Sequence, residues 1–187
     1  KTHQPPAEKR YYPLAQEVIT GTYVGDYDYV LDLLDRCYFP TREGVANFHD
    51  NFVDALILAG EEKIAEGKVE QAVTLYKKAF TYPENHQVFL VDERATHDAQ
   101  INYCLGEAYA ALGQDAEAEK YWKLAAEQDY ELKGSKDFRY WTGLALERLG
   151  RKAEAEAIFS ALVADGEAAV VTQPVNFYGA EGTTGAT

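Results

Sequence analysis

The chain has 187 residues, of which 47% are hydrophobic, and 31 acidic against 18 basic residues give it a formal net charge of −13. This charge argues against nucleic acid or an anionic membrane surface as the main partner, because both are negatively charged and attract proteins through lysine and arginine. The apolar fraction is normal for a folded protein, and the length allows one domain or three to five helical repeats.

The first segment is predicted to be a lead-in followed by one helix pair. Residues 1–12 are predicted to be a flexible lead-in, because residues 1–10 are polar and include a Pro-Pro. Residues 13–44 hold one helix before Gly25 and a second after it, in which apolar residues form a wide stripe with aspartates outside. Breaker residues follow at 39–44. We interpret this pair as a degenerate N-terminal repeat or a cap.

Three units follow within residues 45–166, at about 45–80, 99–130 and 136–166. In each unit a glycine is followed twelve residues later by an alanine, and four residues after that by an aromatic residue. These positions are Gly60, Ala72 and Tyr76; Gly106, Ala118 and Trp122; and Gly143, Ala155 and Phe159. This recurrence predicts three similar helix pairs.

The central unit shows the pattern best. Apolar residues recur there with helical spacing on both sides of Gly113. We predict that Gly113 ends the first helix, because glycine enters the left-handed conformation without a Cβ penalty. Asp115 is predicted to cap the second helix. The small residues Gly106 and Ala118 would let the two helix axes approach closely.

From residue 45 onward, two long segments fall outside the three units. The first is a long connection, residues 81–98, between the first and second units. The second is the C-terminal stretch 167–187, where the pattern fades and Gly and Thr become frequent, so that we predict a loose tail.

At the quoted positions the units resemble the tetratricopeptide repeat, a helix pair of about 34 residues. They depart from its consensus at Asn102 and Arg139, where tryptophan is commonest, and in the missing proline at the repeat ends, for which Pro83 is the nearest substitute. The resemblance implies an all-α fold, an α-solenoid of antiparallel helix pairs with about eight helices in a superhelix. It also implies that the first helix of each unit lines a concave, ligand-binding face.

A narrower resemblance rests on the segments CYFPTREG, LYKKAFTYPENH and THDAQINYCLGEAYAALGQDAEAEKYW. They are similar to the C-terminal repeat region of a group of large bacterial proteins. Those proteins carry a carbohydrate-enzyme-like β-sandwich N-terminal part of unknown function. The resemblance implies that this chain is the helical tail of such a protein, with any carbohydrate chemistry in the missing part.

The repeat consensus places a groove on the first helix of each unit. The positions it assigns are Asp54, Ile57, Glu61 and Ile64; Tyr103, Glu107 and Ala110; and Tyr140, Leu144, Glu147 and Arg148. The tyrosines would form an amphipathic strip and the glutamates an acidic rim. Family members that clamp a C-terminal carboxylate use Asn, Lys and Arg here, whereas only Arg148 is cationic in this chain, so we expect a ligand with basic or aromatic anchors. The alternative is that these residues merely face solvent or the neighbouring repeats.

The long connection is the second candidate site. A loop of this length in a compact array is often a binding element, and Phe89, Val91 and His97 are its candidate docking residues. The alternative is that its apolar residues pack over the groove or an adjacent helix, while Thr96 or Asp98 caps the next helix. Its histidines and acids match no metal-ligand spacing, so we expect no metal and no cofactor.

Other features narrow the class of protein. Cys37 and Cys104 lie outside any CxxC pattern, which indicates reduced, partly buried thiols. No apolar run approaches the roughly 18 residues of a membrane span and no signal peptide is visible, so we expect a cytoplasmic protein. The chain begins at Lys1 and lacks methionine, so we expect a piece of a longer protein.

These observations leave three functional hypotheses. The chain has no nucleophile elbow, phosphate-binding glycine loop or HExxH motif, so we expect no catalytic residues and no enzyme within it. The first hypothesis is a protein-interaction or scaffold module that binds a peptide or protein surface on its concave face. The second is an accessory C-terminal helical domain of a bacterial carbohydrate-active enzyme, packed on a missing catalytic β-sandwich. The third is a self-associating scaffold, a homodimer.

Overall fold

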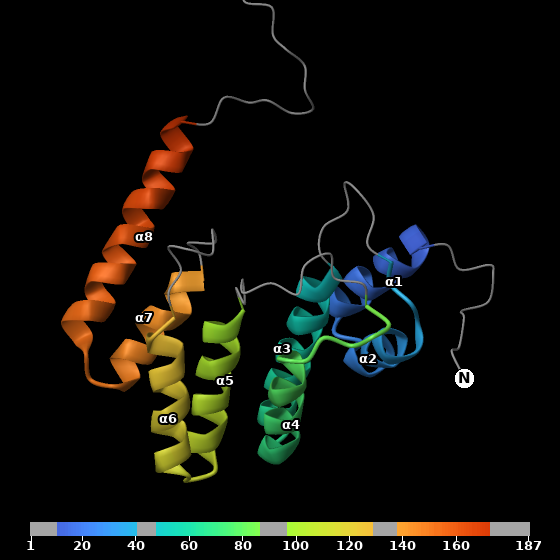
Figure 1. Ribbon diagram of the computed structural model, residues 1–187, viewed down its shortest axis with the longest axis horizontal. Helices are drawn as coiled ribbons and strands as arrows, with labels where there is room; N and C mark the ends of the chain where they lie inside the picture. The colour runs from blue at the N-terminus through green and yellow to red at the C-terminus, as the bar shows by residue number, and fades with distance from the viewer. Residues whose placement is uncertain (1–10, 41–47, 87–96, 129–137, 173–187) are drawn as a thin grey trace, which may run out of the picture.

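The computed structural model describes residues 11–40, 48–86, 97–128 and 138–172 (Figure 1). In these ranges the chain forms the helices α1 (Tyr11–Val24), α2 (Tyr27–Arg36), α3 (Phe48–Ala65), α4 (Val69–Ala79), α5 (Asp98–Ala111), α6 (Asp115–Ala126), α7 (Arg139–Arg148) and α8 (Lys152–Thr172). No β-strand occurs in the described ranges, which contain one isolated β-bridge. The prediction of an all-α chain with about eight helices is therefore confirmed. None of these helices is long and apolar enough to cross a membrane.

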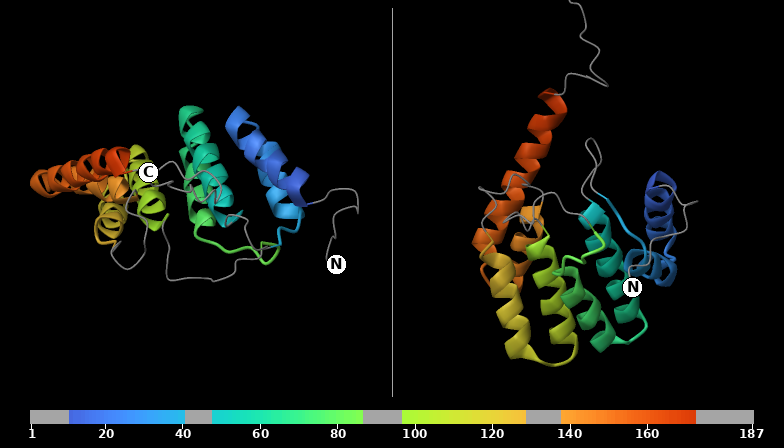
Figure 2. Two further views of the ribbon diagram at one scale, coloured as in Figure 1. Left: turned by 90° about the horizontal axis from the view of Figure 1, so that it is seen from above. Right: turned by 45° about the vertical axis from the view of Figure 1, so that its right-hand side comes forward.

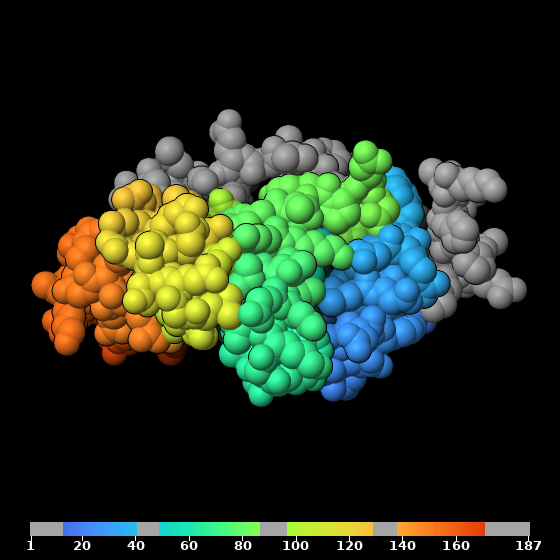
Figure 3. Space-filling view, turned by 90° about the horizontal axis from the view of Figure 1, so that it is seen from below, coloured from blue at the N-terminus to red at the C-terminus, as the bar shows by residue number. Residues whose placement is uncertain are grey.

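The helices lie side by side in chain order (Figures 1 and 2). They pack as α1 on α2, α3 on α4, α5 on α6 and α7 on α8, and each pair contacts the next through α2–α3, α4–α5 and α6–α7. The first helices of successive pairs also contact one another, α1 with α3, α3 with α5, and α5 with α7. Figure 3 shows the same order across one face, from α1 and α2 in blue to α7 and α8 in orange.

Two helix boundaries differ from those expected. The helix α1 begins at Tyr11, inside the expected lead-in, whose first ten residues lie outside the described ranges. The helix α8 runs through Gly166 to Thr172, although the pattern was expected to end at Gly166. A glycine inside a helix costs only about 1 kcal/mol relative to alanine, and the alanines around it are strong helix formers. Residues 173–187 lie outside the described ranges.

A tight turn joins the two helices of the central pair. The helix α5 ends at Ala111, and Gly113 has a φ of 70°, in the left-handed region that favours glycine. The Gln114 amide donates a hydrogen bond of 2.9 Å to the Tyr109 carbonyl, which closes the end of α5. The predicted cap is wrong: Asp115 is the first residue of α6, and Gln114 precedes the helix without a side-chain cap bond. The Asp115 carboxylate instead lies in the first turn, at the positive end of the helix dipole.

A glycine facing an aromatic ring marks the closest approach of helices in three pairs. An ideal Cβ would lie 2.2 Å from Tyr76 at Gly60, 2.4 Å from Trp122 at Gly106 and 2.4 Å from Phe159 at Gly143. Each ring therefore occupies the space that any larger residue would need. The alanines of the same spacing pattern, Ala72, Ala118 and Ala155, are all fully buried. The pattern in the sequence thus corresponds to three similar helix crossings.

The main core is formed mostly by the helices from α1 to α5. Its largest fully buried side chains include Leu14, Val18, Leu34, Phe39, Phe52, Leu56, Ile57, Tyr76, Ile101 and Leu105. Both cysteines are free and buried, as expected for reduced thiols. Burial raises the pKa of Cys104 to about 12, so this thiol stays protonated at neutral pH.

Candidate functional site

The helices α3, α5 and α7 contribute the candidate site, which we call the inner face. It comprises Asp54 and Glu61 on α3, Tyr103 and Glu107 on α5, and Tyr140, Trp141, Leu144 and Arg148 on α7. Contacts between α3 and α5 and between α5 and α7 hold the three helices next to each other. The inner face therefore draws on three segments that are distant in the sequence.

A charged junction connects α5 to α7. Glu107 accepts a hydrogen bond from Trp122 Nε1 at 3.1 Å through Oε1, and its Oε2 lies 2.5 Å from the Arg148 guanidinium. The Glu107 carboxylate, together with the Tyr103 hydroxyl, raises the pKa of Arg148. The predicted acidic rim is therefore wrong at Glu107, because Arg148 neutralises its charge. What remains is a fixed, roughly neutral polar cluster.

An aromatic cluster lies beside this junction. The Tyr103 ring centroid is 5.6 Å from that of Trp141, which is 5.4 Å from Tyr140 in an edge-to-face arrangement. Tyr140 also packs on Phe159 at 5.9 Å, and 47% of its surface stays exposed. The expected strip of Tyr103 and Tyr140 thus includes Trp141, whose ring lies between the two. Half-buried Leu144 follows Tyr140 by one helical turn.

The α3 part of the inner face carries two acids, Asp54 and Glu61. Ile57 is only 2% exposed and belongs to the core, so its assignment to the groove is wrong. The Asp54 and Glu61 side chains reach solvent, and partial burial raises the pKa of both. Within the described ranges, neither carboxylate has a hydrogen-bond or ion-pair partner, although His97 acts on Asp54 electrostatically.

His97 was expected to dock a ligand from the loop, but it is buried at the start of α5. Its Nε2 lies 3.5 Å from Asp50 Oδ1, and its ring centroid is 4.6 Å from that of Phe138. Burial lowers its pKa, but Asp50 and Asp54 outweigh this effect, so the net pKa is raised. His97 therefore joins α3 to the segment before α7.

The beginning of the long connection is hydrogen-bonded to the end of α2. Asn85 Nδ2 donates hydrogen bonds to the carbonyls of Leu34 at 2.8 Å and Cys37 at 2.6 Å. His86 Nε2 lies 2.8 Å from the same Leu34 carbonyl, so it donates there as well. These bonds satisfy carbonyls at the end of α2 that have no partner within the helix. The candidate docking residues Phe89 and Val91, like Thr96, lie outside the described ranges.

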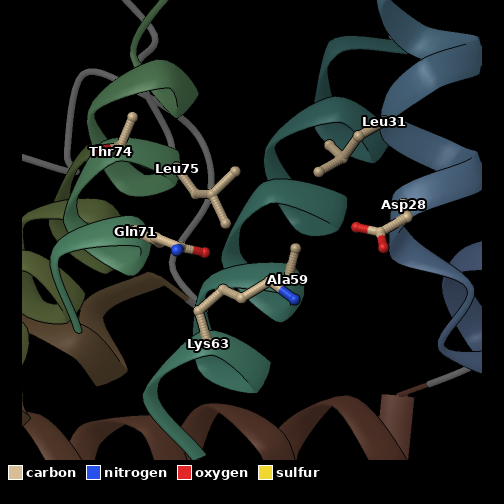
Figure 4. A pocket seen from close by; sticks show the side chains of 7 residues that line it. All are labelled: Asp28, Leu31, Ala59, Lys63, Gln71, Thr74 and Leu75. Atoms are coloured by element: carbon tan, nitrogen blue, oxygen red, sulfur yellow. The ribbon is translucent and has the colours of Figure 1, made fainter. Parts of the chain in front are cut away.

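A separate hollow of about 240 Å³ lies between α2, α3 and α4 (Figure 4). Its lining residues are Asp28, Leu31, Ala59, Lys63, Gln71, Thr74 and Leu75. Leu31 and Leu75 approach it from opposite sides. The Lys63 ammonium is engaged with Glu62 at 3.2 Å and Glu66 at 3.4 Å. Sequence reasoning singled out none of these residues as a site.

The inner face contains polar and aromatic groups but no arrangement typical of a catalytic centre. Across the described ranges, no group of three or more His, Cys, Asp or Glu residues could hold a metal ion. The predictions from the sequence missed Trp141 and the pairing of Arg148 with Glu107. Trp141 could have been found, because it directly follows the candidate residue Tyr140. Nothing in the sequence indicated that Arg148 would pair with Glu107.

Comparison with protein-family models, with curated proteins and with solved structures finds no match for this chain. The resemblances to the tetratricopeptide repeat and to the bacterial repeat region stay predictions.

Proposed function

We propose that this chain is a non-catalytic interaction module that binds a peptide or protein surface along the inner face. Its helix pairs would form a tetratricopeptide-like solenoid, with the inner face as the concave side. Three similar glycine–aromatic crossings and the packing of each pair on the next support this arrangement. Repeats of this kind use their first helices for binding, which agrees with the location of the inner face.

The main support for this function is the contact between α5 and α7, where the aromatic cluster and the charged junction lie side by side. Tyr103, Trp141 and Tyr140 are held against one another, and Arg148 is held by Glu107, before any ligand is present. A fixed surface loses little entropy on binding, so that modest contacts suffice for affinity. Aromatic and arginine side chains at the centre of such surfaces typically contribute most of the binding energy.

Selection of ligands followed by mutation tests the proposal. Twelve-residue peptides would be selected from a random displayed library on the whole chain, and their Kd measured by fluorescence anisotropy. We expect Tyr140→Ala and Trp141→Ala to weaken binding about tenfold or more, as is usual for a central aromatic residue.

Tyr23→Ala supplies a matched control, because Tyr23 is a tyrosine that is 88% exposed on α1. It should leave the Kd unchanged. Equal affinity of all three variants and the original chain would show that the ligands bind elsewhere. Circular dichroism would establish that each variant remains helical.

A further inference from the structure

Resting on the proposed function, we infer that the ligand is a basic peptide segment. Its Lys or Arg side chains would lie on the α3 carboxylates, and its apolar or aromatic residue on the rings of α5 and α7. The inner face then has two parts with different chemistry, an acidic α3 part and an aromatic α5–α7 part.

The spacing of the two α3 carboxylates suits a pair of cations. Asp54 and Glu61 are seven residues apart on one helix, so they lie on the same side at an axial separation of about 10 Å. A peptide in the polyproline II conformation rises about 3.1 Å per residue with three residues per turn, so basic residues three positions apart lie on one side of it and nearly match this separation. Long, flexible Lys and Arg stems would absorb the remaining mismatch.

The charge balance of the inner face favours a cation over an anion. Its one arginine, Arg148, is already paired with Glu107, so among the described residues the carboxylates of Asp54 and Glu61 remain without an ion-pair partner, although His97 acts on Asp54 electrostatically. These carboxylates are exposed on one side of α3, so an incoming ammonium or guanidinium can reach both of them, with an attraction that salt should weaken. Phosphate groups would be repelled, which excludes nucleic acid in favour of a protein segment.

The aromatic part adds a second point of contact. The exposed surface of Tyr140 and the half-buried rings of Tyr103 and Trp141 offer apolar area to a neighbouring side chain of the peptide. The same rings can also accept a cation on their faces. A segment with two basic residues and one aromatic or aliphatic residue therefore fits the inner face better than an acidic or a purely apolar one.

Parallel peptide selections on the original chain and on the double variant Asp54→Asn, Glu61→Gln test this ligand chemistry. We expect Lys and Arg to be enriched in peptides selected on the original chain, often three positions apart. That enrichment should disappear with the double variant, which retains size and hydrogen bonding but not charge. Similar basic content in both pools, or none in the first, would overturn the basic-ligand inference.

Affinity measurements make the test quantitative. For the leading basic peptide, acetylation of its lysines should weaken binding about tenfold, and so should the double variant, because partly desolvated charge pairs are lost. Glu70→Gln, on the exposed surface of α4, should leave the Kd unchanged. If acetylated and unmodified peptides bind equally well yet Tyr140→Ala weakens both, the proposed function stands and the basic-ligand inference falls. If neither dependence is found, both fall.

Discussion

The two ends of the molecule are packed in different ways. From α1 to α5, large side chains such as Phe52, Leu56 and Leu105 are fully buried in one continuous cluster. Around α7, the buried cluster of the described residues comprises Ala99, Ala125 and Ala145, with half-buried rings packed against it. Burying a large apolar side chain stabilises a fold by about 1.5 to 3 kcal/mol, whereas alanine contributes far less. The N-terminal part should therefore carry most of the stability.

The difference explains why the aromatic part of the inner face lies at α7. Trp141 and Tyr140 complete the packing against α5 and α8, yet they keep surface that a ligand can reach. The C-terminal half of α8 projects beyond α7, and residues 163–170 are exposed (Figure 1). Binding surfaces are often drawn from regions of lower local stability, so the proposed binding surface and the weaker packing would coincide at α7.

The largest expected effect comes from removing a core ring. Phe52→Ala should lower the free energy of unfolding by about 3 to 5 kcal/mol, because Phe52 is 0% exposed. Trp141→Ala should cost clearly less despite the larger side chain, since that ring is only half-buried. Urea denaturation of both variants measures the difference. Equal losses of unfolding free energy in the two variants would contradict the claim that the N-terminal part carries most of the stability.

Protonation of His49, in the N-terminal core, should weaken the fold in acid. Burial lowers the pKa of His49 from 6.5 to about 4, and the His49 ring stacks on Tyr82 at 4.1 Å. In this pH interval the unfolded chain binds a proton that the folded chain does not. The contribution of His49 to the free energy of unfolding is therefore full above pH 6.5. It falls as the pH decreases towards 4, by up to about 3 kcal/mol.

His49→Gln removes this titration and tests its source. The variant should show a flatter dependence of unfolding free energy on pH between 6.5 and 4, measured by urea denaturation at several pH values. His97 acts in the opposite direction, since its raised pKa stabilises the fold below pH 6.5 and this contribution is lost as the pH rises through the folded value. An unchanged slope in His49→Gln would assign the acid effect to other groups.

Two glycine substitutions compare a packed crossing with an exposed position on α8. Gly106→Ala should destabilise by about 1 to 3 kcal/mol, because its Cβ would lie 2.4 Å from the Trp122 ring. Gly166→Ala should stabilise by about 0.5 to 1 kcal/mol, because nothing lies within 4 Å and alanine favours the helix. Thermal melts of the two variants should shift in opposite directions. A shift in the same direction would contradict the difference in packing.

The smallest expected effect is that of the charged junction. Arg148→Met should change the free energy of unfolding by less than about 1 kcal/mol, because the Arg148 side chain is 51% exposed and such ion pairs contribute little. Chemical denaturation at low and high salt would measure it. A loss as large as that of Trp141→Ala would mean that the ion pair, and not the rings, holds α7 on α5.

The sequence by itself determined the helices and the places where they cross. Helical periodicity and the glycine at 113 were sufficient to predict α5, its end and the following helix. The spacing from Gly106 to Trp122 predicted a close crossing because it reflects one helix pair, whose two members are near in sequence. Such local regularities are set by backbone geometry, which the sequence reports directly.

Only the tertiary structure decided which side chains remain available on the inner face. Ile57 shares a helix with Asp54 and Glu61, but neighbouring helices bury it. Glu107 is neutralised by a residue 41 positions away, and periodicity within a helix says nothing about such a partner. A repeating pattern identifies the sides of each helix, whereas the packing of one helix on the next determines which groups can meet a ligand.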